Sequence, residues 1–174
     1  MRKNIYLAAV FSDHCVLQRN KEIRVWGCAP HGTKIEVALA GKREETRAQG
    51  NAWEITLPAM EAGGPHVLEV ASEGKVYQRF EDVMIGEVWL AGGQSNMEYM
   101  LKQDADGAAA LERMADADVR YYQVQQVPFM DDYFYRVEQD NHWMLANDEE
   151  KDTWSAVGFY FAERLAKELG VTVG

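Results

Sequence analysis

Short runs in which apolar and polar residues alternate occupy the first half of the chain, between Ile23 and Phe80. Turn-forming residues separate these runs, and strands bounded in this way are typical of antiparallel sheets. The pattern predicts strands at residues 23–27, 35–39, 53–57, 67–70 and 76–80, with a turn at residues 63–65. An apolar run at residues 5–11 predicts an earlier first strand. Strands of this length and spacing indicate a small antiparallel β-sandwich over residues 1–82.

A different hydrophobic pattern begins at residue 83. Residues 84–91 form a nearly continuous apolar run, which is typical of a strand buried on both faces of a parallel sheet. A helix is predicted at residues 108–115, a strand at 119–124, and the start of another buried strand at 171–174. This order of elements is typical of an α/β domain. We therefore expect residues 83–174 to form the first part of a second domain, which the chain does not complete.

The last helix has the clearest periodicity. Four apolar residues recur at intervals of four and form one stripe, namely Val157, Phe161, Leu165 and Leu169. In an amphipathic helix such a stripe faces the core. Polar residues at 152–155 offer N-caps, and Gly170 is the expected C-terminal stop. The sequence therefore predicts a helix over residues 155–169.

Charge narrows the classes of partner. Twenty-eight acidic and 18 basic residues give a net charge of −10, which is the wrong sign for a nucleic-acid partner.

The two cysteines, Cys15 and Cys28, form no Cys-x-x-Cys pair, so no disulfide framework is indicated. No apolar stretch approaches the roughly 18 residues of a membrane span, and residues 5–11 meet no small-residue cleavage site. We expect a folded cytoplasmic protein with no membrane partner.

The strongest candidate for chemistry is Ser95, which follows the predicted strand at 84–91 through Gly92-Gly93-Gln94. This position corresponds to the carboxyl end of a sheet strand, where open α/β sheets bind ligands. A hydroxyl there can act as a nucleophile, and the amide of the same residue can donate to the oxyanion that forms. Spacing alone fits a glycine-rich turn equally well, since the Gly-x-Ser-x-Gly pattern of α/β-hydrolases is absent.

Several motifs together resemble the sialate O-acetylesterase family of SGNH-type serine hydrolases in order and spacing. They are Phe11–His14, Val16–Arg19, Val25–Gly27, Leu57–Met60, Ala62–Pro65, Gly86–Leu90, Gly93–Glu98, Trp154–Phe161 and Lys167–Val171. Linked motifs in one order are more specific than a lone Gln-Ser-Asn. The match extends along essentially the whole chain. The sequence departs from the commoner family pattern, Cys-Ser-Gly-Gln-Ser-Asn-Met-Glu-Trp, at Ala91, Gly92 and Tyr99.

The resemblance implies an α+β chain in two parts, an N-terminal antiparallel β-sandwich followed by the beginning of an SGNH-like three-layer α/β domain. It implies that Ser95 attacks the acetyl carbonyl of an O-acetylated sugar, the expected partner, without a metal or another cofactor. The expected site neighbourhood comprises Gly92, Gly93, Gln94, Asn96, Met97, Glu98 and Tyr99. The family's other oxyanion donors and its Asp-x-x-His base have no match here, so little activity is expected of the chain alone.

The four histidines of the sequence are poor candidates to replace that base. Ser12-Asp13-His14 resembles a compressed triad, but neighbouring side chains on a strand point to opposite faces, so a structural turn is the favoured interpretation. His31 and His66 fall in the predicted sandwich. His142 precedes the last helix without an Asp-x-x-His context, and a surface position is favoured.

Several alternatives stay open. Aromatic residues can form a sugar-stacking wall or, as favoured, pack the core, and Tyr99 can line the pocket. The aromatic cluster comprises Tyr121, Tyr122, Phe129, Tyr133, Phe134, Tyr135 and Trp143. The substrate can be an acetyl ester of a plant polysaccharide, or the chain can be a non-catalytic carbohydrate-binding sandwich. An open sheet edge where the chain stops is expected to promote self-association.

Overall fold

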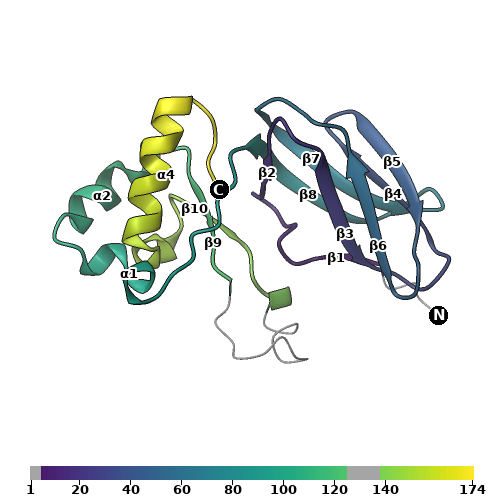
Figure 1. The fold of residues 1–174 in the computed structure, drawn as a ribbon, viewed down its shortest axis with the longest axis horizontal. Coiled ribbons are helices and arrows are strands. Elements are labelled where there is room, and N and C mark those ends of the chain that lie inside the picture. The colour runs from purple at the N-terminus through teal and green to yellow at the C-terminus, as the bar shows by residue number, and fades with distance from the viewer. Residues whose placement is uncertain (1–4, 125–137) are drawn as a thin grey trace.

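The computed structural model describes residues 5–124 and 138–174, and it is mostly β with three small sheets and few helices (Figure 1). A three-stranded sheet has the order β1-β3-β6, formed by β1 (Tyr6–Leu7), β3 (Ile23–Cys28) and β6 (Ala52–Leu57). A five-stranded sheet is formed, in spatial order, by β2 (Val16–Gln18), β8 (Lys75–Gly86), β7 (Gly63–Ser72), β4 (Lys34–Leu39) and β5 (Lys42–Arg47). The third sheet pairs β9 (Arg120–Tyr122) with β10 (Trp143–Leu145).

The first two sheets share one hydrophobic core because burial alternates along their strands. In β4, Ile35, Val37 and Leu39 are buried, while the residues between them are partly exposed. Val25 of β3 and Leu57 of β6 reach the same core from the other sheet. Side chains of a strand point alternately to its two faces, so the period-two pattern of the sequence correctly predicted these strands and their inward residues.

Three details of this region differ from the sequence prediction. The five-stranded sheet is mixed rather than antiparallel, because β2 pairs with β8 in parallel, and it curls like half a barrel (Figure 1). Residues 63–65, predicted as a turn, belong to β7, whose register with β8 is irregular there. β5 carries no apolar signal, because it is an exposed edge strand held by pairing with β4.

The prediction of one buried strand over residues 84–91 is wrong in its second half. β8 ends at Gly86, and the next apolar side chains are exposed, Leu90 by 90%. Glu87 and Val119 each form a parallel bridge with Val173, which is fully buried. Parallel pairing is therefore present in this region, but within the described residues it is limited to short bridges.

The helices lie in the second half of the chain. Within the described residues, the helices with defined bounds are α1 (Ser95–Glu98), α2 (Gly107–Arg113) and α4 (Ala156–Leu169), with 3₁₀ turns η1 (Leu101–Gln103), η2 (Met114–Asp116) and η3 (Glu149–Thr153). The Ser155 hydroxyl accepts a hydrogen bond from the Gly158 N–H at 3.2 Å and caps α4. Gly170, with φ of 64°, ends the helix in the left-handed conformation. The predicted bounds of this helix are confirmed.

The face that α4 buries differs from the prediction. Val157, Phe161 and Leu169 of the predicted core stripe are exposed, Phe161 by 47%. Ala156, Phe159 and Ala166 are buried instead, in a second core that includes Trp154 and Met114. The helix has apolar residues on more than one side, and only the elements packed against it decide which side is covered.

A buried arginine joins the two halves of the described chain. The Arg120 guanidinium of β9 donates to the main-chain oxygens of His14 and Asp82, and its Nη2 lies 3.0 Å from Asp82 Oδ1. The Asp82 carboxylate also pairs with His14 Nδ1 at 2.7 Å. Nearby, the Trp143 indole donates to the Val10 carbonyl at 2.8 Å. These contacts fix β9 and β10 against the sandwich.

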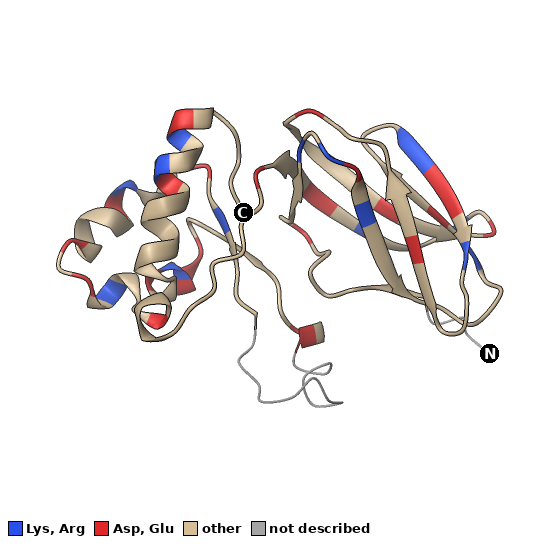
Figure 2. Ribbon diagram, viewed as in Figure 1, with Lys and Arg blue, Asp and Glu red and all other residues tan. Residues whose placement is uncertain are grey.

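Acidic and basic residues are interspersed over both halves of the chain (Figure 2). Many of them form exposed pairs, for example Arg24 with Glu54 and Arg164 with Glu168. Among the described residues, none of the helices has the length and apolar character needed to cross a membrane.

Candidate active site

Ser95 is the first residue of α1, and it is exposed. The segment that leads to it leaves the sandwich at Glu87, whose carboxylate accepts from Arg19 Nε at 2.7 Å. Gln94 is the N-cap, and its carbonyl accepts from the Met97 N–H at 2.8 Å. The first amides of a helix have no partner inside the helix. The Ser95 amide is therefore in a position where it can donate to another group.

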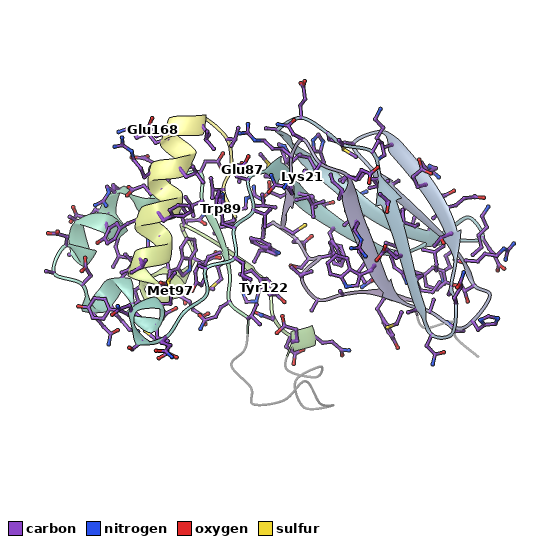
Figure 3. The ribbon with its side chains drawn as sticks, viewed as in Figure 1. Lys21, Glu87, Trp89, Met97, Tyr122 and Glu168 are labelled. Atoms are coloured by element: carbon purple, nitrogen blue, oxygen red, sulfur yellow. The ribbon has the colours of Figure 1, made fainter. Side chains whose placement is uncertain are left out.

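Contacts with the N-terminal end of α4 hold α1 in place. Figure 3 shows Met97 beside that end of α4 and Trp89 farther along the same helix. The Met97 sulfur lies 3.8 Å from the Ser155 hydroxyl, and the Tyr99 carbonyl accepts from the Ala156 N–H at 2.8 Å. Gly93 also packs closely, since a Cβ there would lie 2.9 Å from Met97 Cγ. The same serine that caps α4 thus contacts the helix that carries Ser95.

The predicted neighbourhood forms one continuous surface segment. Gly92, Gly93, Gln94, Asn96, Glu98 and Tyr99 are exposed, and Met97 is partly buried. The Tyr99 hydroxyl donates to the Gln103 carbonyl in η1. No residue of the described chain hydrogen-bonds the Ser95 hydroxyl. The roles assigned to Ser95 and to its neighbours stay predictions.

The histidines have other partners or positions. His14 pairs with Asp82, while the Ser12 hydroxyl donates to the Asp13 carbonyl, so Ser12-Asp13-His14 does not act as a triad. His31 Nδ1 accepts from the Gly50 N–H at 3.1 Å. His142 is exposed, as predicted. Within the described residues, no histidine hydrogen-bonds Ser95, so the structure shows no base that would activate its hydroxyl.

The described members of the aromatic cluster pack inside the protein. Tyr121 stacks on Trp154 with ring centroids 5.1 Å apart, and burial raises the pKa of its hydroxyl. Tyr122 contacts Trp143 at 5.5 Å. Core packing, the favoured interpretation, is confirmed for these residues. The other predicted members, Phe129, Tyr133, Phe134 and Tyr135, lie outside the described residues.

The described part of the chain contains no group of three or more His, Cys, Asp or Glu side chains that could hold a metal ion.

Comparison with solved structures defines the class of protein. A carbohydrate acetylesterase from Xanthomonas citri matches the chain with a TM-score of 0.83 and 34% sequence identity, over 98% of this chain and 39% of that one. The chain therefore shares its fold with part of that acetylesterase. Among curated proteins, the sialate O-acetylesterase of Mus musculus is 28% identical over 148 residues, and that of Pongo abelii is 30% identical over 121 residues. The chain is a distant homologue of the sialate O-acetylesterases, which confirms the resemblance found in the sequence.

The chain spans 27% of the mouse protein and 23% of the orangutan protein. The aligned regions cover 78% and 62% of this chain, respectively. No family model matches the chain.

Proposed function

We propose that Ser95 is the nucleophile of a serine esterase that removes O-acetyl groups from carbohydrates. The observation that carries the proposal is the exposed position of Ser95 at the start of α1, in a chain that follows a carbohydrate acetylesterase over 98% of its length. We further propose that the acetylated sugar is a sialic acid, because the curated relatives are sialate O-acetylesterases. The second candidate substrate is an acetyl ester of plant polysaccharide, since the solved relative is a carbohydrate acetylesterase whose name specifies no particular sugar.

The proposed reaction has two stages. The Ser95 hydroxyl oxygen bonds to the acetyl carbon while a base takes its proton, and the oxyanion accepts from the Ser95 amide. Collapse of this intermediate breaks the bond to the sugar oxygen, which takes the proton and leaves as a free hydroxyl. Water then attacks the acetyl-serine and releases acetate. The base and the remaining oxyanion donors of this reaction are not among the described residues.

The proposal includes an SGNH-like α/β domain that begins after the sandwich. The parallel bridges of Val173 with Glu87 and Val119 support this assignment. The position of α4 supports it too, because this helix lies between Val119 and Val173 in the sequence. A three-layer domain places a helix over such a sheet. The proposed bounds of the two domains are 1–82 and 83–174. A cytoplasmic location remains a prediction. Self-association through an open sheet edge also remains a prediction.

The test compares serine variants in the protein at its natural length. We expect Ser95→Ala to lower acetate release from O-acetylated sialic acid by at least about 10³-fold, because the nucleophile is lost. Ser12→Ala is the control, since it makes the same chemical change at a serine outside the site. The 174-residue chain should show turnover near background with either substitution.

The outcomes separate the candidates. Acetate release from acetylated xylan but not from acetylated sialic acid, with the same loss in Ser95→Ala, would assign the plant polysaccharide. Unchanged turnover in Ser95→Ala on both substrates would reject Ser95 as the nucleophile.

A further inference from the structure

A hollow lies on the sandwich, at the edge where its two sheets meet. It has a volume of about 440 Å³, within the range of small-ligand sites, and β3, β5 and β6 supply most of its walls. β5 and β6 are the last strands of their sheets. The residues that matter for recognition are Trp26, Thr46, Arg47, Gln49, Trp53 and Glu54. Figure 1 shows these strands at the far end of the molecule from α1, so the hollow is separate from Ser95.

The hollow has an exposed tryptophan whose orientation is fixed. The Trp26 side chain is 44% exposed, although large aromatic side chains are usually buried. Its ring meets the buried Phe11 at a centroid distance of 4.7 Å and an interplanar angle of 78°. A ring held in this way loses little conformational freedom when a ligand stacks on it. Trp26 is therefore a pre-oriented aromatic platform.

Polar groups surround this platform. Glu54 lies directly across from Trp26 in the pairing of β3 with β6, and the Arg24 guanidinium binds its carboxylate with Nε at 3.1 Å. Arg47 donates one hydrogen bond to the Gly32 carbonyl at 3.1 Å and has further N–H groups, while Gln49 is exposed. Arg47 donates hydrogen bonds, the Glu54 carboxylate accepts them, and the Gln49 amide does both. They suit a ligand with many hydroxyls around an apolar ring face.

We propose that this hollow, which we call the Trp26 hollow, binds a neutral oligosaccharide, with Trp26 stacking on a pyranose ring and Arg47, Gln49 and Glu54 bonding its hydroxyls. The ligand is neutral because Glu54 is already paired with Arg24, and the net charge of −10 repels a polyanion. The Trp26 hollow is remote from Ser95, so it suits a polymer that the protein holds at two places. The inference rests on the geometry of the sandwich and holds for binding whether or not Ser95 is a nucleophile.

The test measures binding in the absence of turnover. The natural-length protein with Ser95→Ala is run on native gels that contain soluble xylan, xyloglucan or glucomannan, and its mobility gives a dissociation constant. We expect retardation by at least one of these neutral polysaccharides. Adding Trp26→Ala should raise that constant about tenfold, because stacking is lost, whereas Trp26→Phe keeps an aromatic ring and should stay within about threefold.

Gln49→Ala is the second variant, since its side chain is exposed and we expect its loss to leave the fold intact. It should weaken binding without a change in the thermal unfolding midpoint. Absence of retardation by all three polysaccharides, retardation by polysialic acid alone, or equal retardation of Trp26→Ala and its parent would overturn the proposal. Because every variant lacks the Ser95 hydroxyl, failure here is distinct from failure of the esterase proposal.

Discussion

At the scale of single residues, two motifs that resemble the esterase family prove to contact each other. Arg19 and Gln18 both donate to the Glu87 carboxylate, and the Val88 N–H donates back to the Gln18 side chain at 2.9 Å. The hydrogen bond from Arg19 lowers the pKa of Glu87 below its ordinary value of 4.5. These partners are 68 to 70 residues apart in sequence, so the motifs could be recognised from the chain but their pairing could not.

The two cysteines should differ sharply in reactivity. Burial raises the pKa of the Cys15 thiol to about 12, and only a thiolate reacts readily, while Cys28 is exposed. In native protein at pH 8, Ellman's reagent should therefore label Cys28 quickly and Cys15 only on unfolding. Cys28→Ser is the control, and it should remove the fast phase. A fast phase that persisted in this variant would show that Cys15 is accessible.

At the scale of elements, α4 shows which features are local. Each end of α4 is set by a contact between residues no more than four positions apart, Ser155 with Gly158 at the start and Gly170 with Ala166 at the end. The sequence predicted both ends correctly. Its buried face depends on Trp154, Met114 and other residues of the second core, and here the prediction was wrong. The sequence did not predict β5 for a related reason: the pairing of this strand with β4 is made by main-chain groups and needs no apolar side chains.

Two phenylalanines on α4 test this assignment of faces. Phe159 is 1% exposed, so Phe159→Ala should lower the free energy of unfolding by about 3–5 kcal/mol, because it leaves a cavity. Phe161 is half exposed and contacts Trp89 at 5.2 Å, so Phe161→Ala should cost only about 1 kcal/mol. Urea denaturation of the 174-residue chain measures both. A larger loss for Phe161→Ala than for Phe159→Ala would mean that the predicted stripe, and not the observed face, is the buried one.

At the scale of the whole molecule, the Asp82 cluster connects the sandwich with β9. Burial alone would raise the pKa of Asp82, but hydrogen bonds from His14 and Arg120 outweigh it and hold that pKa below 3.8. A carboxyl whose pKa is lower in the folded state stabilises the fold above its unfolded pKa. That contribution is lost as the pH falls from about 4 through the lower, folded pKa.

Asp82→Asn tests this connection with little change in shape, and asparagine also tolerates the φ of 52° found there. We expect a loss of about 1–2 kcal/mol in the free energy of unfolding at pH 7, and a shallower decline below pH 4, because no carboxyl remains to be protonated. Glu168→Gln removes an exposed pair with Arg164 and should cost less than about 0.5 kcal/mol. Parallel acid-denaturation curves for Asp82→Asn and the parent would contradict the assignment.

The sequence by itself determined most strands of the sandwich, the bounds of α4, and the exposed serine at the start of α1 as the candidate nucleophile. These features depend on periodicity, caps and motifs, which involve residues close together in the chain. Only the tertiary structure decided that β2 runs parallel to β8, which face of α4 is buried, and that Trp26 and Arg47 line one hollow. Each of these depends on contacts between distant segments, whose partners no local pattern specifies.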